Sequence, residues 1–357
     1  MGKKTNMMDY LDWRGDLTLD KVPFNEVDNI ILSMMSFVDF AVSGGDKEKV
    51  SLLTAVETFA SLPDDEKYMG AIIPDIIIDM AVKAGRSKRF EGTFVCDFVN
   101  CVDKCNIEQF SAVTFLLPDK SIFVAFRGTD DSVAGWKEDL LLSLTTGVPA
   151  QLKAAEYLSS VAEKTEGSIR VGGHSKGGNL AVYAAVKAPE NVQSRIVSVY
   201  CNDGPGFLPE FANSAEVWSI AHKIVNLVPE ASVVGMLMEH IGKCRIISSA
   251  GRSVVQHNPF LWEVRVDRFA DKKSRSRFAG NSDRTVKKWV EYENADEKKE
   301  IIEAIFAVLD ATGAETLTDL RTNPVRCAAA AQKALNQMDK DKRDKAVKVI
   351  KEIVAVK

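Results

Sequence analysis

The sequence predicts an α/β fold in which helices flank a mostly parallel central sheet. Between residues 93 and 270, short runs rich in β-branched and aromatic residues alternate with helical segments, an alternation typical of parallel sheets. Within this region Gly173, Ser175 and Gly177 form a G-x-S-x-G pattern between a strand-like run and a helix of small residues. Helical periodicity dominates both ends of the chain. We therefore expect an α/β core with helical additions before and after it.

Residues 1–92 are predicted to form a helical segment packed on the core. Asn25 can cap a helix whose apolar residues over 27–38 follow the three-four spacing of an amphipathic helix. Two further helices, each followed by a proline or a glycine that ends it, are predicted over Lys47–Leu62 and Ile76–Ala84.

Residues 93–270 are predicted to form the core, because here the period changes from helical to strand-like. A turn at 118–120 joins two of the strands into a hairpin that feeds the sheet. The predicted strands are Phe94–Val99, Phe110–Leu117, Ser121–Phe126, Ile169–Val171, Arg195–Cys201, Ala221–Val228 and a hairpin of Arg245–Ser249 with Ser253–Gln256. The predicted helices are Pro149–Lys164, one that starts after Ser175 and ends before Pro189, and Ser232–Met238.

Residues 271–357 are predicted to form a C-terminal helical segment. It begins with a polar, charged stretch over 271–284 that is typical of a linker or surface loop. The last helix carries apolar residues along one side, which favours docking onto the body over binding to a membrane surface. The predicted helices are Val286–Tyr292, Glu297–Ala311, Ala328–Met338 and Lys345–Val356.

Composition excludes several classes of protein. The chain has 357 residues, 46% of them hydrophobic, and a net charge of −4, so it can bury a large core and has no basic field that would indicate nucleic acid as a partner. Its six cysteines are irregularly spaced and show neither a zinc pattern nor a disulfide framework. The first residues lack the apolar stretch of a signal peptide, and no apolar run has the length of a membrane span. We expect a cytoplasmic protein with reduced thiols and no stable membrane insertion.

The G-x-S-x-G pattern predicts a nucleophilic serine. A serine in a sharp strand-to-helix turn has a strained backbone and an exposed hydroxyl, and the flanking positions must lack a Cβ because strand and helix cross there. Ser175 meets these conditions, since the strand-like residues 169–171 precede it and a helix of small residues follows. We therefore expect Ser175 to be a nucleophile.

A serine hydroxyl needs a base, usually a histidine that a carboxylate orients. The chain has four histidines. His174 lies inside the turn and is expected to be structural, with its side chain directed away from the face of the serine, while His222 and His240 are interpreted as satisfied surface or core histidines. His257 follows the last strands of the core and fits the chain order serine, acid, histidine. It is the predicted base.

Three residues are candidates for the acid. Asp203 follows the strand that comes next after Ser175, and Asn226 and Glu230 lie at the end of the strand after that. An ionised carboxylate holds the imidazole tautomer and stabilises the imidazolium, whereas an amide can only orient the ring. We predict Asp203 as the acid, with Glu230 and Asn226 as alternatives; a turn aspartate that caps the following loop remains the other interpretation of Asp203.

The residues after the strand that ends at Phe126 suit an oxyanion-binding loop. A glycine followed by a hydroxyl residue, Gly128 and Thr129, lets the backbone approach a ligand closely and offers a donor. In an α/β-hydrolase the loop after the third strand gives one oxyanion donor and the residue after the serine gives the other. Thr129 and Lys176 are therefore the predicted donors.

These motifs carry a family resemblance. Phe126-Arg127-Gly128-Thr129 with Trp136 and Asp139-Leu140, and then Gly173-His174-Ser175-Lys176-Gly177-Gly178, resemble the class 3 lipases, which are α/β-hydrolases acting on acylglycerols. The resemblance covers roughly residues 93–265. Including the opening DYLDWRGDLTL and the closing VVQHNPFLW, the chain looks still more like an uncharacterised bacterial family of lipase-class-3-like proteins.

The resemblance implies an α/β-hydrolase fold with Ser175 as the nucleophile, Thr129 and the Lys176 amide as oxyanion donors, and His257 as the base. It also implies a lid-like segment over 131–142. The sequence departs from the family at two places. Lys176 stands where class 3 lipases usually have Leu, and their D-x-V-P acid motif appears as Asn226-Leu227-Val228-Pro229.

The predicted function is a serine hydrolase that cleaves a carboxylic ester, such as a lipid or another acyl ester, through an acyl-enzyme on Ser175. This reaction needs no metal or other cofactor. The changed acid motif motivates an alternative, a non-catalytic α/β-hydrolase fold that binds a ligand or a partner protein. A thioesterase or an amidase could use the same three residues.

Overall fold

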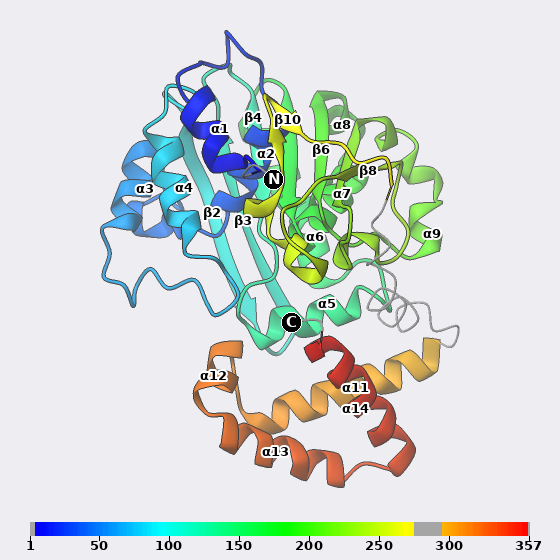
Figure 1. The fold of residues 1–357 in the computed structure, drawn as a ribbon. Helices are drawn as coiled ribbons and strands as arrows, with labels where there is room; N and C mark the ends of the chain where they lie inside the picture. Colours follow the sequence, from blue (N-terminus) through cyan, green and yellow to red (C-terminus); the bar gives the residue numbers. More distant parts are fainter. Residues whose placement is uncertain (1–3, 275–294, 356–357) are drawn as a thin grey trace.

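The computed structural model describes residues 4–274 and 295–355 and has an eight-stranded sheet at its centre. The strands lie side by side in the order in which they occur along the chain (Figure 1). The first four strands pair antiparallel, and the fourth to the eighth pair parallel. The predicted α/β fold with a mostly parallel sheet is confirmed. The strands are β1 Val50–Ser51, β2 Phe94–Asp103, β3 Glu108–Leu116, β4 Ile122–Phe126, β5 Ile169–His174, β6 Ile196–Asn202, β7 Ile224–Pro229 and β8 Cys244–Ile247, and a separate small hairpin is formed by β9 Val264–Arg265 and β10 Arg268–Phe269.

The register of the parallel strands places their carboxyl ends at one edge of the sheet. Phe126 of β4 pairs with Gly173 of β5, and His174 pairs with Asn202 of β6. Residues that directly follow these strands are therefore neighbours in space, although they are far apart in the sequence.

Helices cover both faces of the sheet (Figure 1). The N-terminal helices pack on one face with a core that includes Ile30, Phe40 and Phe123, and the helices that follow β4 and β5 pack on the other face with Leu158, Leu180 and Ala184. The helices of the first group are α1 Met7–Arg14, α2 Glu26–Met35, α3 Leu52–Ala60 and α4 Ile76–Gly85; those of the second group are α6 Pro149–Lys164, α7 Lys176–Lys187 and α8 Glu190–Arg195, and the short α9 Pro209–Ala212 follows β6.

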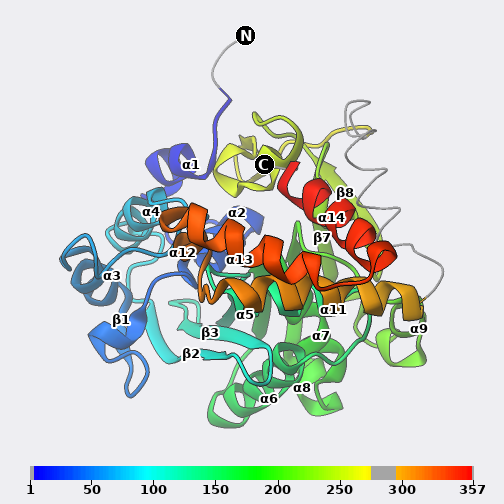
Figure 2. The same ribbon diagram turned by 90° about the horizontal axis from the view of Figure 1, so that it is seen from below.

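The C-terminal helices form a further layer at the edge where the parallel strands end (Figure 1). They are α11 Ala295–Thr312, α12 Leu317–Thr322, α13 Pro324–Asn336 and α14 Lys340–Ala355. Figure 2 shows them lying across the molecule over α5, Val133–Leu141. Ile301, Ile302 and Ile305 of α11 pack with leucines of the α5 region and with Leu237 and Met238.

Asp131 fixes this layer to the core. Its side chain accepts hydrogen bonds from the backbone and the hydroxyl of Thr318, and from the backbone N–H of Ala71. The Nζ of Lys137 lies 2.5 Å from the carboxylate of Asp310. The segment 131–142, expected to resemble a lid, thus consists mainly of helix α5 held between the core and α11.

Two predicted elements after β7 are wrong. Ser232–Met238 forms only a 3₁₀ turn at Val234–Met236, and Ser253–Gln256 is not a strand but part of the 3₁₀ turn Ser253–His257. The residues that directly follow β8 in the sequence pair instead with later residues, as in the bridge between Ser249 and Trp262. The predicted helix Val286–Tyr292 lies outside the described residues.

Several predicted boundaries need smaller corrections. The helix expected over Lys47–Leu62 is preceded by β1 and shortened to α3, and the strand expected from Ala221 begins at Ile224 after a 3₁₀ turn. Helices α1, α5, α8, α9 and α12 and the hairpin of β9 and β10 are additional elements that were not predicted from the sequence. The cap at Asn25 is confirmed, because its side chain accepts hydrogen bonds from the backbone of Val27 and Asp28.

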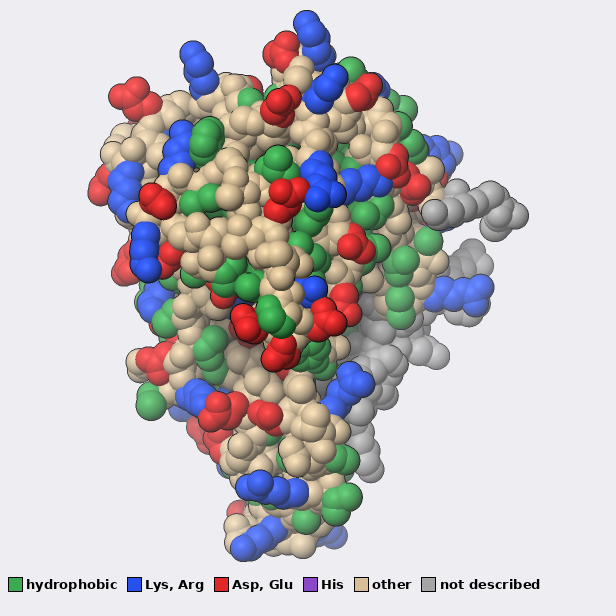
Figure 3. Space-filling model, turned by 90° about the vertical axis from the view of Figure 1, so that its left-hand side faces the viewer, with side chains coloured by type: hydrophobic (Ala, Val, Ile, Leu, Met, Phe, Trp, Pro, Cys, Tyr) green, Lys and Arg blue, Asp and Glu red, His purple; other side chains and the backbone are tan. Residues whose placement is uncertain are grey.

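The surface charges and the cysteines can be compared with what the composition predicts. Basic and acidic side chains are interspersed over the face drawn in Figure 3. The six cysteines, all within the described residues, form no disulfide. Each helix of the described residues is too short or too polar to cross a bilayer.

Candidate functional site

Ser175 occupies the sharp turn between β5 and α7. Its backbone has φ 58° and ψ −132°, a strained conformation for a residue with a side chain. A Cβ on Gly173 would lie 2.3 Å from the carbonyl carbon of Gly177, and one on Gly177 would lie 2.1 Å from the carbonyl oxygen of Phe126. The predicted requirement for two glycines is confirmed. Within the described residues, the Ser175 hydroxyl has no hydrogen-bond partner.

The loop after β4 approaches this serine closely. A Cβ on Gly128 would lie 2.7 Å from the carbonyl oxygen of His174 and 3.3 Å from the Cβ of Ser175, so only glycine fits. Across the described parts of the chain, the backbone N–H groups of Thr129 and Lys176 have no acceptor. Two free donors beside a nucleophile are what an oxyanion hole requires.

The hydroxyl of Thr129 is already occupied. It donates a 2.6 Å hydrogen bond to the carboxylate of Asp139 in α5. Burial raises the pKa of Asp139 to about 6, although Lys176 and the bond from Thr129 oppose the rise. The free donor at Thr129 is therefore its backbone N–H, and the side-chain bond holds the loop in place.

The structure brings His257 and Asp203 together. His257 Nδ1 lies 2.7 Å from Asp203 Oδ2, and the side chain of Asp203 is fully buried whereas that of His257 is 30% exposed. The backbone of Asp203 has φ 51°, and a Cβ on Gly235 would lie 2.0 Å from Asp203 Oδ1. Gly235 thus leaves room for the carboxylate. Because Nδ1 is held by Asp203, Nε2 of His257 is the nitrogen left to accept a proton.

The structure does not bring the two alternative acids to His257. The side-chain amide of Asn226 is buried and donates a 2.9 Å hydrogen bond to the carbonyl of Ile241. Glu230 lies 3.3 Å from the Nζ of Lys272. Of the three candidates, only Asp203 contacts the histidine within the described residues.

The sequence did not predict the contacts of the Lys176 side chain. Its Nζ is buried and donates 2.9 Å hydrogen bonds to Glu138 Oε2 and to the carbonyl of Gln109. Glu138 also accepts from the backbone N–H groups of Gln109 and Ala150. This pair ties the start of α7 to α5, β3 and α6. The only sequence signal was the charged residue at a position where an apolar one is usual.

His174, expected to be structural and directed away from the serine face, is buried against His257. Their ring centroids lie 4.4 Å apart, and the His174 ring also faces Trp262. Of the other two histidines, His240 has a pKa that burial lowers, and His222 is exposed.

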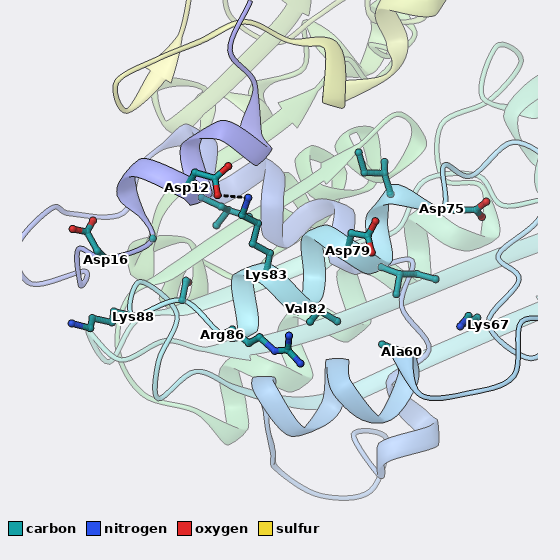
Figure 4. A pocket seen from close by; sticks show the side chains of 15 residues that line it. Asp12, Asp16, Ala60, Lys67, Asp75, Asp79, Val82, Lys83, Arg86 and Lys88 are labelled. Carbon is teal, nitrogen blue, oxygen red and sulfur yellow. Dashed lines mark ion pairs between the residues drawn. The ribbon is translucent and has the colours of Figure 1, made fainter.

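A cavity of about 1090 Å³ lies away from these residues, between α1, α3 and α4 (Figure 4). Its lining side chains carry both signs of charge, and Asp12 and Lys83 pair across it at 2.5 Å. None of the predicted site residues lines it. The cavity is therefore separate from the candidate active site.

Two solved structures similar to this chain are of the Rhizomucor miehei lipase propeptide complex. The native complex has 17% identity and a TM-score of 0.41 over 65% of this chain and 78% of that chain. A deletion mutant of the complex has 14% identity and a TM-score of 0.41 over 72% and 81%. A search of curated proteins finds no significant match. The model of the Mbeg1-like family matches residues 84–307, more than half of the sequence, so this chain belongs to the Mbeg1-like family.

Proposed function

We propose that this protein is a serine hydrolase that cleaves a carboxylic ester, such as a lipid or another acyl ester, through an acyl-enzyme on Ser175. One observation carries the proposal. The strained turn at Ser175 lies at the sheet edge where His257 hydrogen-bonds a fully buried carboxylate, Asp203. A strained serine, a histidine with one free ring nitrogen and a buried acid are the parts that nucleophilic acyl transfer needs.

In the proposed reaction, Ser175 Oγ attacks the ester carbonyl as His257 Nε2 accepts its proton. Asp203 holds Nδ1–H and stabilises the imidazolium. The backbone N–H groups of Thr129 and Lys176 donate to the oxyanion, each contributing on the order of 3 kcal/mol to transition-state stabilisation. The imidazolium then protonates the leaving alcohol, and water activated by His257 hydrolyses the acyl-enzyme. The hydrogen bond between Ser175 and His257 forms when substrate is bound.

A fluorophosphonate probe tests the nucleophile. Wild-type protein should be labelled at one site, and Ser175→Ala should not be labelled. Labelling that persists in Ser175→Ala would remove Ser175 from the mechanism. Short-chain p-nitrophenyl esters then give a rate for the variants that follow.

Two matched variants test the acid. Asp203→Asn keeps the shape of the side chain but removes the charge, and should lower kcat by about 10⁴-fold because the imidazole tautomer and the imidazolium lose their support. Glu230→Gln, which changes a carboxylate paired with Lys272, should keep the wild-type rate. Equal wild-type rates in both variants would reject Asp203 as the acid.

One observation favours a second candidate, a non-catalytic fold that binds a ligand or a partner protein. Within the described residues, the Ser175 hydroxyl makes no hydrogen bond to His257. Folded protein that neither reacts with the probe nor hydrolyses esters would support this candidate. Competing thioester and amide substrates separate a thioesterase or an amidase from an esterase, because the three share the proposed residues.

A further inference from the structure

His174 lies at the end of β5, directly before the proposed nucleophile, and it contacts the loop that carries the proposed base. Its Nε2 is 2.8 Å from the carbonyl oxygen of His257. The two rings also face each other, with centroids 4.4 Å apart and planes inclined by 37°. The side chain that precedes Ser175 therefore contacts both the main chain and the imidazole of His257.

The contact defines the protonation of His174. A carbonyl oxygen only accepts hydrogen bonds, so Nε2 must carry the proton. Burial and the neighbouring His257 hold the pKa of His174 well below its usual value, although the bond to the carbonyl opposes this. A neutral imidazole with a fixed N–H is a donor that does not compete with His257 for the proton of the reaction.

A second aromatic side chain donates a hydrogen bond to the carbonyl of the residue before His257. Trp262 is fully buried, and its Nε1–H donates a 2.8 Å hydrogen bond to the carbonyl of Gln256. Two consecutive carbonyls of the 3₁₀ turn Ser253–His257 thus accept ring N–H donors. The side chain of Gln256 adds a 2.7 Å bond from the backbone of Ala231. Among the hydrogen bonds of the described residues, the His174 contact is the one that joins this turn to the strand that carries the serine.

We propose that His174 is a positioning residue for the base: its Nε2–H holds the His257 main chain and so sets the position of the His257 imidazole relative to Ser175. The inference rests on the proposed function, and adds to it a direct link between the nucleophile's strand and the base's loop. Asp203 orients His257 through Nδ1, and His174 holds it through the main-chain carbonyl. Together they leave the His257 imidazole little freedom to turn.

Substitutions of His174 separate this role from simple packing. His174→Gln keeps an N–H donor at about the position of Nε2, whereas His174→Phe keeps an aromatic ring and loses the donor. Exposed His222 gives the matched control, His222→Phe. Measurements are kcat and KM for a p-nitrophenyl ester, the rate of fluorophosphonate labelling and the melting temperature.

We expect His174→Phe to lower kcat and the labelling rate by roughly 10- to 100-fold with little change in KM, because a small displacement of a catalytic group has an effect of this size. His174→Gln should recover most of the loss, and His222→Phe should match the wild type. If His174→Phe does not fold, His174→Asn, whose amide stops short of the carbonyl, takes its place. A wild-type kcat in the variant without the donor, or a glutamine variant no better than it, overturns the inference.

A proton NMR measurement keeps this inference distinct from the proposed function. The N–H between His257 and Asp203 should give a low-field resonance that His257→Gln removes. His174→Phe should shift or broaden this resonance and His174→Gln should restore it, whether or not the protein hydrolyses esters. An unchanged resonance in His174→Phe overturns the positioning role. Failure of Ser175 labelling in wild-type protein overturns only the hydrolase.

Discussion

Removing the charge of Lys176 should destabilise the protein far more than removing a charge at the surface. The Lys176 and Glu138 side chains are 1% and 0% exposed, and Nζ lies 2.9 Å from Oε2. Lys176→Met leaves the Glu138 carboxylate buried without its counter-ion, which costs about 3–5 kcal/mol. Two backbone N–H groups still donate to Glu138, which favours the lower end of this range, about 3 kcal/mol. The carbonyl of Gln109 also loses its donor, which adds about 1 kcal/mol.

The double variant Lys176→Met/Glu138→Gln should recover at least about 2 kcal/mol of this loss, because no buried charge remains and the glutamine oxygen still accepts a hydrogen bond. Urea unfolding followed by circular dichroism measures the free energies. In thermal melts, Lys176→Met should lower the melting temperature by roughly 5 °C, because the unfolding entropy of a 357-residue protein corresponds to about 1.3 °C per kcal/mol.

A surface pair gives the matched control. Lys187 and Glu216 pair with side chains 36% and 55% exposed, so Lys187→Met should cost less than about 1 kcal/mol. A Lys176→Met protein no less stable than Lys187→Met would refute the expected cost of the unpaired buried carboxylate. A double variant at Lys176 and Glu138 that is less stable than Lys176→Met alone would also refute it.

Single contacts at Gly235, Asp139 and Asp131 should each have a measurable effect. Gly235→Ala would place a Cβ 2.0 Å from Asp203 Oδ1 and should lower kcat at least about tenfold by displacing the carboxylate; steady-state kinetics at wild-type rates would contradict this. Because burial raises the pKa of Asp139 from 3.8 to about 6, the folded protein binds more protons than the unfolded chain between these values. The stability that Asp139 contributes is present below pH about 4 and lost as pH rises through about 6. From pH 4 to 7, the free energy of unfolding of the wild type should therefore fall by on the order of 3 kcal/mol relative to that of Asp139→Asn, as measured in denaturant titrations. A difference between the two proteins that does not depend on pH would refute this prediction. Asp131→Ala leaves two donors of Thr318 unpaired and should weaken the attachment of α12 by about 1–3 kcal/mol, seen as faster amide exchange at Thr318; unchanged exchange would exclude this role.

The sequence was sufficient where local sterics decide the structure. The turn at Ser175 was predictable because two flanking glycines are needed wherever a strand and a helix cross so closely. Asn25 was predictable as a cap because its side chain competes well for the free N–H groups of a helix start. Asp203 could be preferred to Asn226 because only a carboxylate can stabilise an imidazolium, but its preference over Glu230 depends on the contact with His257, which only the structure shows.

The local sequence did not predict the structure where contacts between residues far apart in the chain determine it. Val254 and Val255 favour a strand, yet Ser253–His257 forms a 3₁₀ turn, since side chains of His174 and Trp262 bind its carbonyls. The expected helix Ser232–Met238 contains Gly235, which must sit against Asp203 and lowers helix propensity. Lys176 and Glu138 are 38 positions apart, so nothing in either neighbourhood indicates that they pair. Tertiary contacts outweigh propensity at each of these places.

The sequential order of the strands bears on how the protein is made. Every strand from β2 to β8 lies beside the one synthesised before it, so the sheet can grow on the ribosome without inserting a strand between two that have already paired. Contacts between the start of the described chain and the end of the core do not follow this order. Thr5 and Asn6 hydrogen-bond to Val264 and Phe260, just beyond His257, so these two residues must wait for residues made after the whole sheet. We expect the loop that carries the histidine to acquire its final shape late, after the nascent sheet is complete.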